Sequence, residues 1–180
     1  MHSAVYQYGG SANKNIGDAF LLVWKIPKDK YKIESNNSVV WDEKSRYVNI
    51  LCDFALLSFV KIIVKINKEP KILKYRHDHK LVARLGPGYQ VKMGFGLHLG
   101  WAIEGAIGSE YKIDASYLSP NVNMASRLEA ATKQYGVPIL ISSSVYSMRT
   151  PEVKPFVRNI DRVTVKGSVQ PIGLYTVDLD

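Results

Sequence analysis

The stretch from Gly94 to Gly136 constrains the fold more than any other part of the chain. Its pattern predicts a strand, a glycine-rich hairpin, a loop and then a helix. Ser119 suits the N-cap of that helix, and Pro120 suits its first position. Gly136 and Pro138 predict where the helix ends.

One face of the predicted helix is expected to pack on a sheet. At about 100° per residue, that face carries five residues: Val122, Ala125, Leu128, Thr132 and Tyr135. Asn123 and Arg127 are four positions apart, so they lie together on roughly the opposite side. An amide beside a guanidinium near a helix N-terminus suits an anion, although an isolated pair of this kind is more often a solvated helix face.

The composition is that of an ordinary soluble globular protein, with 180 residues, 46% hydrophobic and 22% charged. This length suits one domain with a sizeable core. The net charge of +8 favours acidic partners such as nucleotides, nucleic acid or an acidic protein surface. No stripe of basic residues interleaved with aromatics is present, so nucleic-acid binding is not expected.

Cysteine usage and the first residues both predict a cytoplasmic location. Cys52 is the single cysteine and has no internal disulfide partner, as expected in a reducing compartment. Residues 1–4 lack the basic and apolar regions of a signal peptide. Residues 48–66 could span a membrane by length, but three charges interrupt them: Asp53, Lys61 and Lys65. A buried helix is therefore predicted there, and any membrane attachment would come from parts outside this chain.

Two further segments are predicted to be irregular. Residues 25–47 are polar, lysine-rich and aperiodic, which indicates a surface insertion that is either a partner-binding loop or a plain solvated loop. Residues 67–90 are predicted to form another loop. Its two histidines, His77 and His79, have no third ligand at a suitable spacing, so a metal site is not expected there.

The first part of the chain predicts a hairpin over residues 14–24, with Gly17 and Asp18 at its turn. The glycines of residues 94–100 superficially resemble a dinucleotide-binding fingerprint. Their spacing is wrong for it, and residues 101–105 continue as a strand where that fingerprint requires a helix. These glycines are instead expected to permit close contact between strands and between subunits.

Four separated blocks occur in order along the chain: residues 13–20 (NKNIGDAF), 94–108, 122–129 (VNMASRLE) and 165–167 (VKG). Together they resemble the catalytic domain of class III adenylate and guanylate cyclases. The resemblance implies one cyclase domain over residues 1–180. Its expected fold is a ferredoxin-like α/β sandwich with a mostly antiparallel sheet and helices on one face.

The resemblance assigns Lys14 and Ser116 to recognition of the purine. Adenylate cyclases have a lysine at the first position, which can donate to adenine N1, whereas guanylate cyclases have a glutamate that accepts from guanine. Ser116 keeps the hydroxyl of the threonine used by some adenylate cyclases at the second position. Ala115 and Ser119 depart from the common pattern, in which a glycine usually stands at position 119.

The implied reaction converts ATP to cyclic AMP and pyrophosphate, by attack of the ribose 3′-hydroxyl on the α-phosphorus. Asp18 matches one of two aspartates that bind catalytic Mg²⁺ or Mn²⁺ ions. Asn123 would orient the ribose, Arg127 would stabilise the transition state, and Lys166 would hold the terminal phosphates. In this family the site lies between two subunits, so a homodimer, or a heterodimer with another cyclase domain, is expected.

Family members begin with a strand that bears the first metal aspartate, followed by two helices, and no counterpart precedes Asp18 here. One carboxylate is not expected to hold two divalent cations, so the chain alone is expected to be weakly active or inactive. Three interpretations follow: a fragment of a longer adenylate cyclase, a chain completed by another polypeptide, or a non-catalytic cyclase-homology module. A general RNA-binding α/β domain is a more distant alternative.

Overall fold

The framework of the protein is a four-stranded sheet in the order β5-β8-β10-β9. This computed structural model describes residues 1–35, 39–41, 46–109, 112–164 and 170–179. Within the sheet, β5 (Phe95–Leu97) pairs in parallel with β8 (Ile139–Ser142). β10 (Ile172–Thr176) pairs antiparallel with both β8 and β9 (Arg158–Val163). The mostly antiparallel sheet expected from the sequence is therefore present.

The two long helices, α2 (Tyr47–Lys68) and α5 (Pro120–Tyr135), cover opposite faces of this sheet. Against α2, the core gathers side chains from the helix and from both parallel strands: Ala55, Leu56, Phe59, Ile62, Phe95, Leu97, Ile139 and Ile141. Against α5, the core gathers Leu128, Leu140 and Leu174. The expectation that the helices share one face was wrong, because the continuous apolar run of β8 buries side chains on both of its faces.

Glycines in and beside β5 let α5 lie directly against the strand. A Cβ atom placed on Gly96 would lie 2.2 Å from the carbonyl oxygen of Ala125 in α5, and one placed on Gly94 would lie 2.3 Å from the hydroxyl of Thr132. Such distances are impossible for real side chains. The sequence predicted that these glycines permit contact between strands and between subunits, whereas at Gly94 and Gly96 they permit a close approach of helix to strand.

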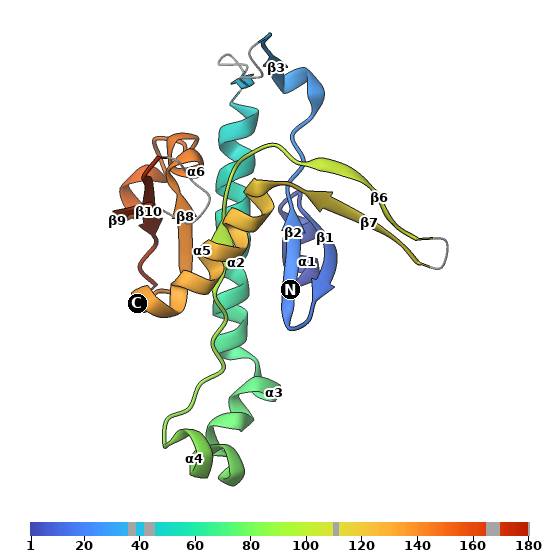
Figure 1. Cartoon of the computed structure of the whole chain (residues 1–180). Helices are drawn as coiled ribbons and strands as arrows, with labels where there is room; N and C mark the ends of the chain where they lie inside the picture. Colours follow the sequence, from blue (N-terminus) through green and yellow to red (C-terminus); the bar gives the residue numbers. More distant parts are fainter. Residues whose placement is uncertain (36–38, 42–45, 110–111, 165–169, 180) are drawn as a thin grey trace.

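Two hairpins flank the helices. β1 (Ser11–Ile16) and β2 (Ala19–Val23) follow α1 (His2–Gln7) and turn at positions 17 and 18, as predicted. β6 (Ile103–Ser109) and β7 (Lys112–Leu118) form a long arm that projects from the body, with its base beside the first hairpin (Figure 1). The remaining elements are short: η1 (Lys28–Lys30), β3 (Tyr31–Ile33), β4 (Val39–Trp41), α3 (Pro70–Leu73), η2 (Lys74–His77), α4 (His79–Leu85), α6 (Ser143–Ser147) and η3 (Lys154–Phe156).

The segment over residues 67–90, predicted to be a loop, instead forms α3, η2 and α4 at the far end of α2 (Figure 1). Asp78 caps α4 by accepting hydrogen bonds from the backbone of Lys80 and Leu81 at 3.0 and 3.1 Å. The sequence did not predict these short helices because the segment is polar and its apolar residues recur only weakly at helical spacing. The predicted surface insertion at residues 25–47 contains η1 and a small β3–β4 hairpin.

α2 is long and apolar enough to cross a membrane, judged by length and composition alone, in the part of the chain that the structure describes. Eight of its residues are nevertheless buried inside the protein. The helix forms the centre of the larger core, as the sequence predicted for residues 48–66.

Candidate nucleotide-binding site

Lys14 and Ser116, the two residues predicted to read the purine, are in direct contact. Lys14 lies on β1 and is half-buried, and its Nζ donates to the Oγ of the buried Ser116 on β7 at 2.7 Å. Beside this bond, the side-chain amide of Asn13 donates to the backbone carbonyl of Ala115 at 3.3 Å. The two bonds join the two hairpins and place an ammonium next to a hydroxyl.

This pair offers a donor and an acceptor side by side. Lys14 has three N–H donors, and Ser116 uses only one of them. The Ser116 oxygen has a second lone pair that can accept another hydrogen bond. A group that carries an acceptor next to an N–H donor would match the two side chains.

The helix that holds Asn123 and Arg127 has the ends that its sequence predicted. The hydroxyl of Ser119 accepts from the backbone N–H of Asn121 at 2.8 Å, and Gly136 ends the helix with a φ of +66°. The buried face differs in detail from the prediction. Met124, Leu128 and Thr132 are buried, whereas Val122 and Ala125 are half-buried, because the helix axis is set by the close contact with β5.

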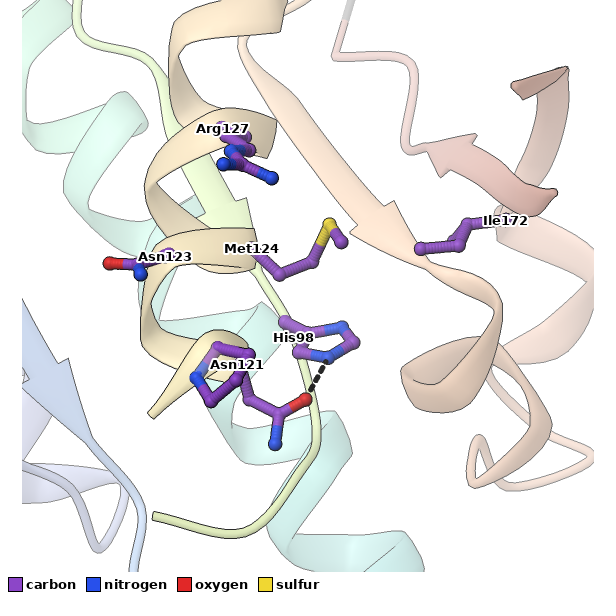
Figure 2. A pocket seen from close by; sticks show the side chains of 7 residues that line it. His98, Asn121, Asn123, Met124, Arg127 and Ile172 are labelled. Carbon is purple, nitrogen blue, oxygen red and sulfur yellow. Dashed lines mark hydrogen bonds between the residues drawn. The ribbon is translucent and has the colours of Figure 1, made fainter. Parts of the chain in front are cut away.

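Asn123 and Arg127 are both exposed on α5 and border a groove of about 410 Å³. In Figure 2, Met124 points from α5 toward Ile172 and His98, whereas Asn123 points to the other side of the helix. The remaining lining residues are Pro120 and Asn121. The amide and the guanidinium are therefore accessible to a ligand or to another subunit.

The sequence did not predict His98 and Asn121 as part of this groove. The Nε2 of His98 lies 3.1 Å from Oδ1 of Asn121, and its Nδ1 lies 2.8 Å from Oγ of Ser142 (Figure 2 shows the first bond). Burial lowers the pKa of His98, and the hydrogen bond to Asn121 offsets part of that effect. The available signal was a lone histidine directly after a short apolar strand.

Asp18, the predicted metal ligand, is exposed at the turn between β1 and β2. Across the described ranges, no three His, Cys, Asp or Glu side chains cluster closely enough to hold a metal ion. One exposed carboxylate, even bridging two ions through its two oxygens, does not complete their coordination, so these described residues by themselves do not fit a two-metal centre. Lys166, the predicted phosphate ligand, lies outside the described residues.

This fold, with Lys14 bonded to Ser116 across two hairpins and with a polar helix face, defines a nucleotidyl cyclase domain. The chain is similar to a bacterial light-regulated adenylyl cyclase structure with a TM-score of 0.62 and 25% identity, covering 98% of this chain and 41% of that one. It shares its fold with the adenylyl cyclase CyaB from P. aeruginosa at a TM-score of 0.63 and 22% identity, covering 99% of this chain and 76% of that one.

Residues 1–178 match the family described as the adenylate and guanylate cyclase catalytic domain. The chain belongs to this family. It is also 38% identical over 89 residues to an adenylate cyclase of Anabaena cylindrica, a match that covers 49% of this chain and 18% of that protein. The matched residues are thus a small part of that larger relative.

Proposed function

We propose that the protein is the catalytic domain of an adenylate cyclase, which converts ATP to cyclic AMP and pyrophosphate in intracellular signalling. The observation that carries this proposal is the 2.7 Å hydrogen bond between Lys14 and Ser116. It assembles a purine-reading pair from two hairpins that are distant in sequence. The similarity to a protein named adenylate cyclase supports the same substrate.

The chemistry of this pair favours adenine over guanine. Adenine presents the N1 acceptor beside the N6 amino donor, which complements the Lys14 donor beside the Ser116 acceptor. Guanine presents the O6 acceptor, N1–H and its 2-amino group. Lys14 and Ser116 could bond O6 and N1–H, but Lys14 has no acceptor atom, so the pair leaves the 2-amino group without a partner, whereas it satisfies both groups of adenine.

Asn123 and Arg127 would act on the ribose and on the reacting phosphate. Both are exposed on α5, where an incoming triphosphate or a second subunit can reach them. A guanidinium can stabilise the negative charge that builds on the phosphate oxygens as the 3′-hydroxyl attacks. Lys166 is proposed to bind the terminal phosphates. A homodimer, or a heterodimer with another cyclase domain, would combine these groups with Asp18 of the neighbouring subunit.

Mg²⁺ or Mn²⁺ is the proposed cofactor, with Asp18 as one ligand. The other ligands would come from outside the described residues.

The location is proposed to be cytoplasmic. Residues 25–47 are a proposed protein-binding segment.

Isothermal titration calorimetry of the chain with ATP and with GTP, each with Mn²⁺, tests the proposal. We expect ATP to bind more tightly than GTP. The substitution Lys14→Glu should weaken ATP binding by at least about tenfold, because it removes a charged hydrogen-bond donor. Lys28→Glu makes the same charge change at an exposed site on η1 and should leave binding unchanged. Equal affinity for both nucleotides, or equal effects of the two substitutions, would contradict the substrate assignment.

One observation favours a second function, that of a non-catalytic cyclase-homology module in a larger assembly. The described residues contain no metal-binding cluster. This alternative predicts that ATP does not bind measurably to the chain and that no cyclic AMP forms when the chain is assayed with Mg²⁺ or Mn²⁺, alone or together with another cyclase domain. Formation of cyclic AMP in that assay would exclude it.

A further inference from the structure

His98 connects three elements that surround the groove. It follows β5 directly, and its ring contacts Asn121 in the first turn of α5 at 3.1 Å and Ser142 at the end of β8 at 2.8 Å. The Oγ of Ser144, in α6, lies 3.4 Å from Nδ1 of His98, the nitrogen that also contacts Ser142. The same hydroxyl donates to the carbonyl oxygen of Leu99 at 3.2 Å. The histidine is the centre of a polar network.

The hydrogen bonds of Asn121 assign the tautomer of His98. The Nδ2 of Asn121 donates to the carbonyl oxygen of Trp101 at 2.9 Å, so its Oδ1 faces the histidine as an acceptor. The Nε2 of His98 must then carry the proton, and its Nδ1 accepts from a serine hydroxyl. The neutral ring satisfies both of its nitrogens in this arrangement.

The bond to Asn121 acts on the part of α5 that bears the predicted ribose and phosphate ligands. Asn121 precedes Asn123 by two residues and Arg127 by six. Ser119 caps the helix by accepting from the backbone N–H groups of Asn121 and Val122, bonds that do not reach β8. His98 adds side-chain hydrogen bonds between the first turn of α5 and the end of β8 to the packing of the helix on the sheet.

We propose that His98 is a positioning residue that acts through Asn121 to orient Asn123 and Arg127 toward the nucleotide. This inference rests on the proposed function for its consequence, but its structural basis is independent. A glutamine at position 98 can place an N–H donor near the position of Nε2, whereas an alanine cannot. The pair of substitutions therefore separates the hydrogen bond from the volume of the side chain.

Calorimetry with ATP and Mn²⁺ tests the consequence. His98→Ala should weaken ATP binding about five- to tenfold, the value of one oriented hydrogen bond, with His98→Gln recovering most of the loss. Asn121→Ala should produce a similar loss, and the double alanine variant should be no worse than either single one, because the two residues act as one unit. Ser126→Ala, at an exposed position of α5, should have no effect. Additive losses, or no recovery with glutamine, would overturn the proposal.

Two measurements test the positioning without nucleotide. In ¹⁵N NMR spectra of the unliganded wild-type chain, His98 should show a protonated Nε2 and an unprotonated Nδ1 at neutral pH. In His98→Gln, hydrogen exchange at the Asn123 amide should stay close to wild type, whereas in His98→Ala it should accelerate without a matching change at Leu128. An unprotonated Nε2, or unchanged exchange at Asn123 in His98→Ala, would overturn the proposal. If wild type does not bind ATP, the substrate assignment fails, and these two measurements still decide the role of His98.

Discussion

Gly96 sets the distance between β5 and α5. The strand passes so close to the helix that a Cβ atom at this position would overlap backbone atoms of Ala125 and Glu129, at 2.2 and 2.5 Å. Backbone atoms cannot move aside as a flexible side chain can. The helix would have to shift, and with it the exposed face that carries Asn123 and Arg127.

Gly96→Ala is therefore expected to destabilise the protein by about 3 kcal/mol, as overpacking in a rigid core does. Urea denaturation followed by circular dichroism measures this change. Gly105→Ala is the matched control, because Gly105 lies in β6 with open space where its Cβ would be. It should change stability by less than about 0.5 kcal/mol. Equal effects at the two positions would show that α5 is not packed directly on β5.

His98 is expected to make stability depend on pH. Burial lowers the pKa of its imidazole in the folded protein, so the unfolded chain binds the proton more readily. The corresponding stability is present above the unfolded pKa and is lost as the pH falls through about 6.5 toward the folded value. Thermal melts from pH 8 to pH 5 should show a steeper loss for wild type than for His98→Gln. Parallel curves would contradict this expectation.

At the scale of single elements, α5 combines local signals with long-range packing. Its ends are set by Ser119 and Gly136, whose effects reach only a few residues along the chain. Its orientation is set by β5 and β8. The predicted packing face was correct at Leu128 and Thr132 but omitted Met124, which lies toward the groove (Figure 2).

Ser119→Ala should cost about 1 kcal/mol, because two backbone N–H groups at the start of α5 lose their side-chain acceptor. Differential scanning calorimetry would record the lower melting temperature. Ser126→Ala, in the exposed middle of the same helix, should be neutral or slightly stabilising, since alanine is the better helix former. A neutral Ser119→Ala would mean that solvent replaces the cap without loss.

At the scale of the whole molecule, two ion pairs of very different exposure join α2 and its N-cap residue Arg46 to the segment after α6. Arg149 is fully buried, and its Nη1 lies 3.1 Å from Oδ1 of Asp53, whose side chain is 13% exposed. Arg46 and Glu152 lie 3.0 Å apart with more than half of each side chain exposed. Both pairs connect the same two parts of the chain, so the losses of stability on removing one partner from each pair can be compared directly.

Asp53→Ala should destabilise the protein by about 3 kcal/mol or more, because it leaves a buried guanidinium without its carboxylate. Glu152→Ala should cost less than about 1 kcal/mol, since water solvates the remaining Arg46. Guanidinium chloride unfolding of both variants measures the difference. Similar losses would indicate that Arg149 finds another counter-charge once Asp53 is removed.

Much of the fold was predictable because it depends on short-range rules. The turn at Gly17 and Asp18, the helix over residues 48–66 and both ends of α5 follow from residues only a few positions apart. The short helices of residues 67–90 were missed because their sequence is polar and weakly periodic. The placement of helices on both faces of the sheet was missed because a continuous run of apolar residues shows that a strand is buried but does not specify which element packs on each of its faces.

The order of its motifs determined that this chain belongs to the cyclase family, because local turn, cap and strand signals recur in a fixed succession. Only the tertiary structure brought Lys14 against Ser116 and linked His98 to Asn121 and Ser142. These contacts join residues up to 102 positions apart. Such contacts depend on strand pairing and helix packing. These in turn depend on how whole elements dock against one another and not on the immediate sequence neighbours of any residue.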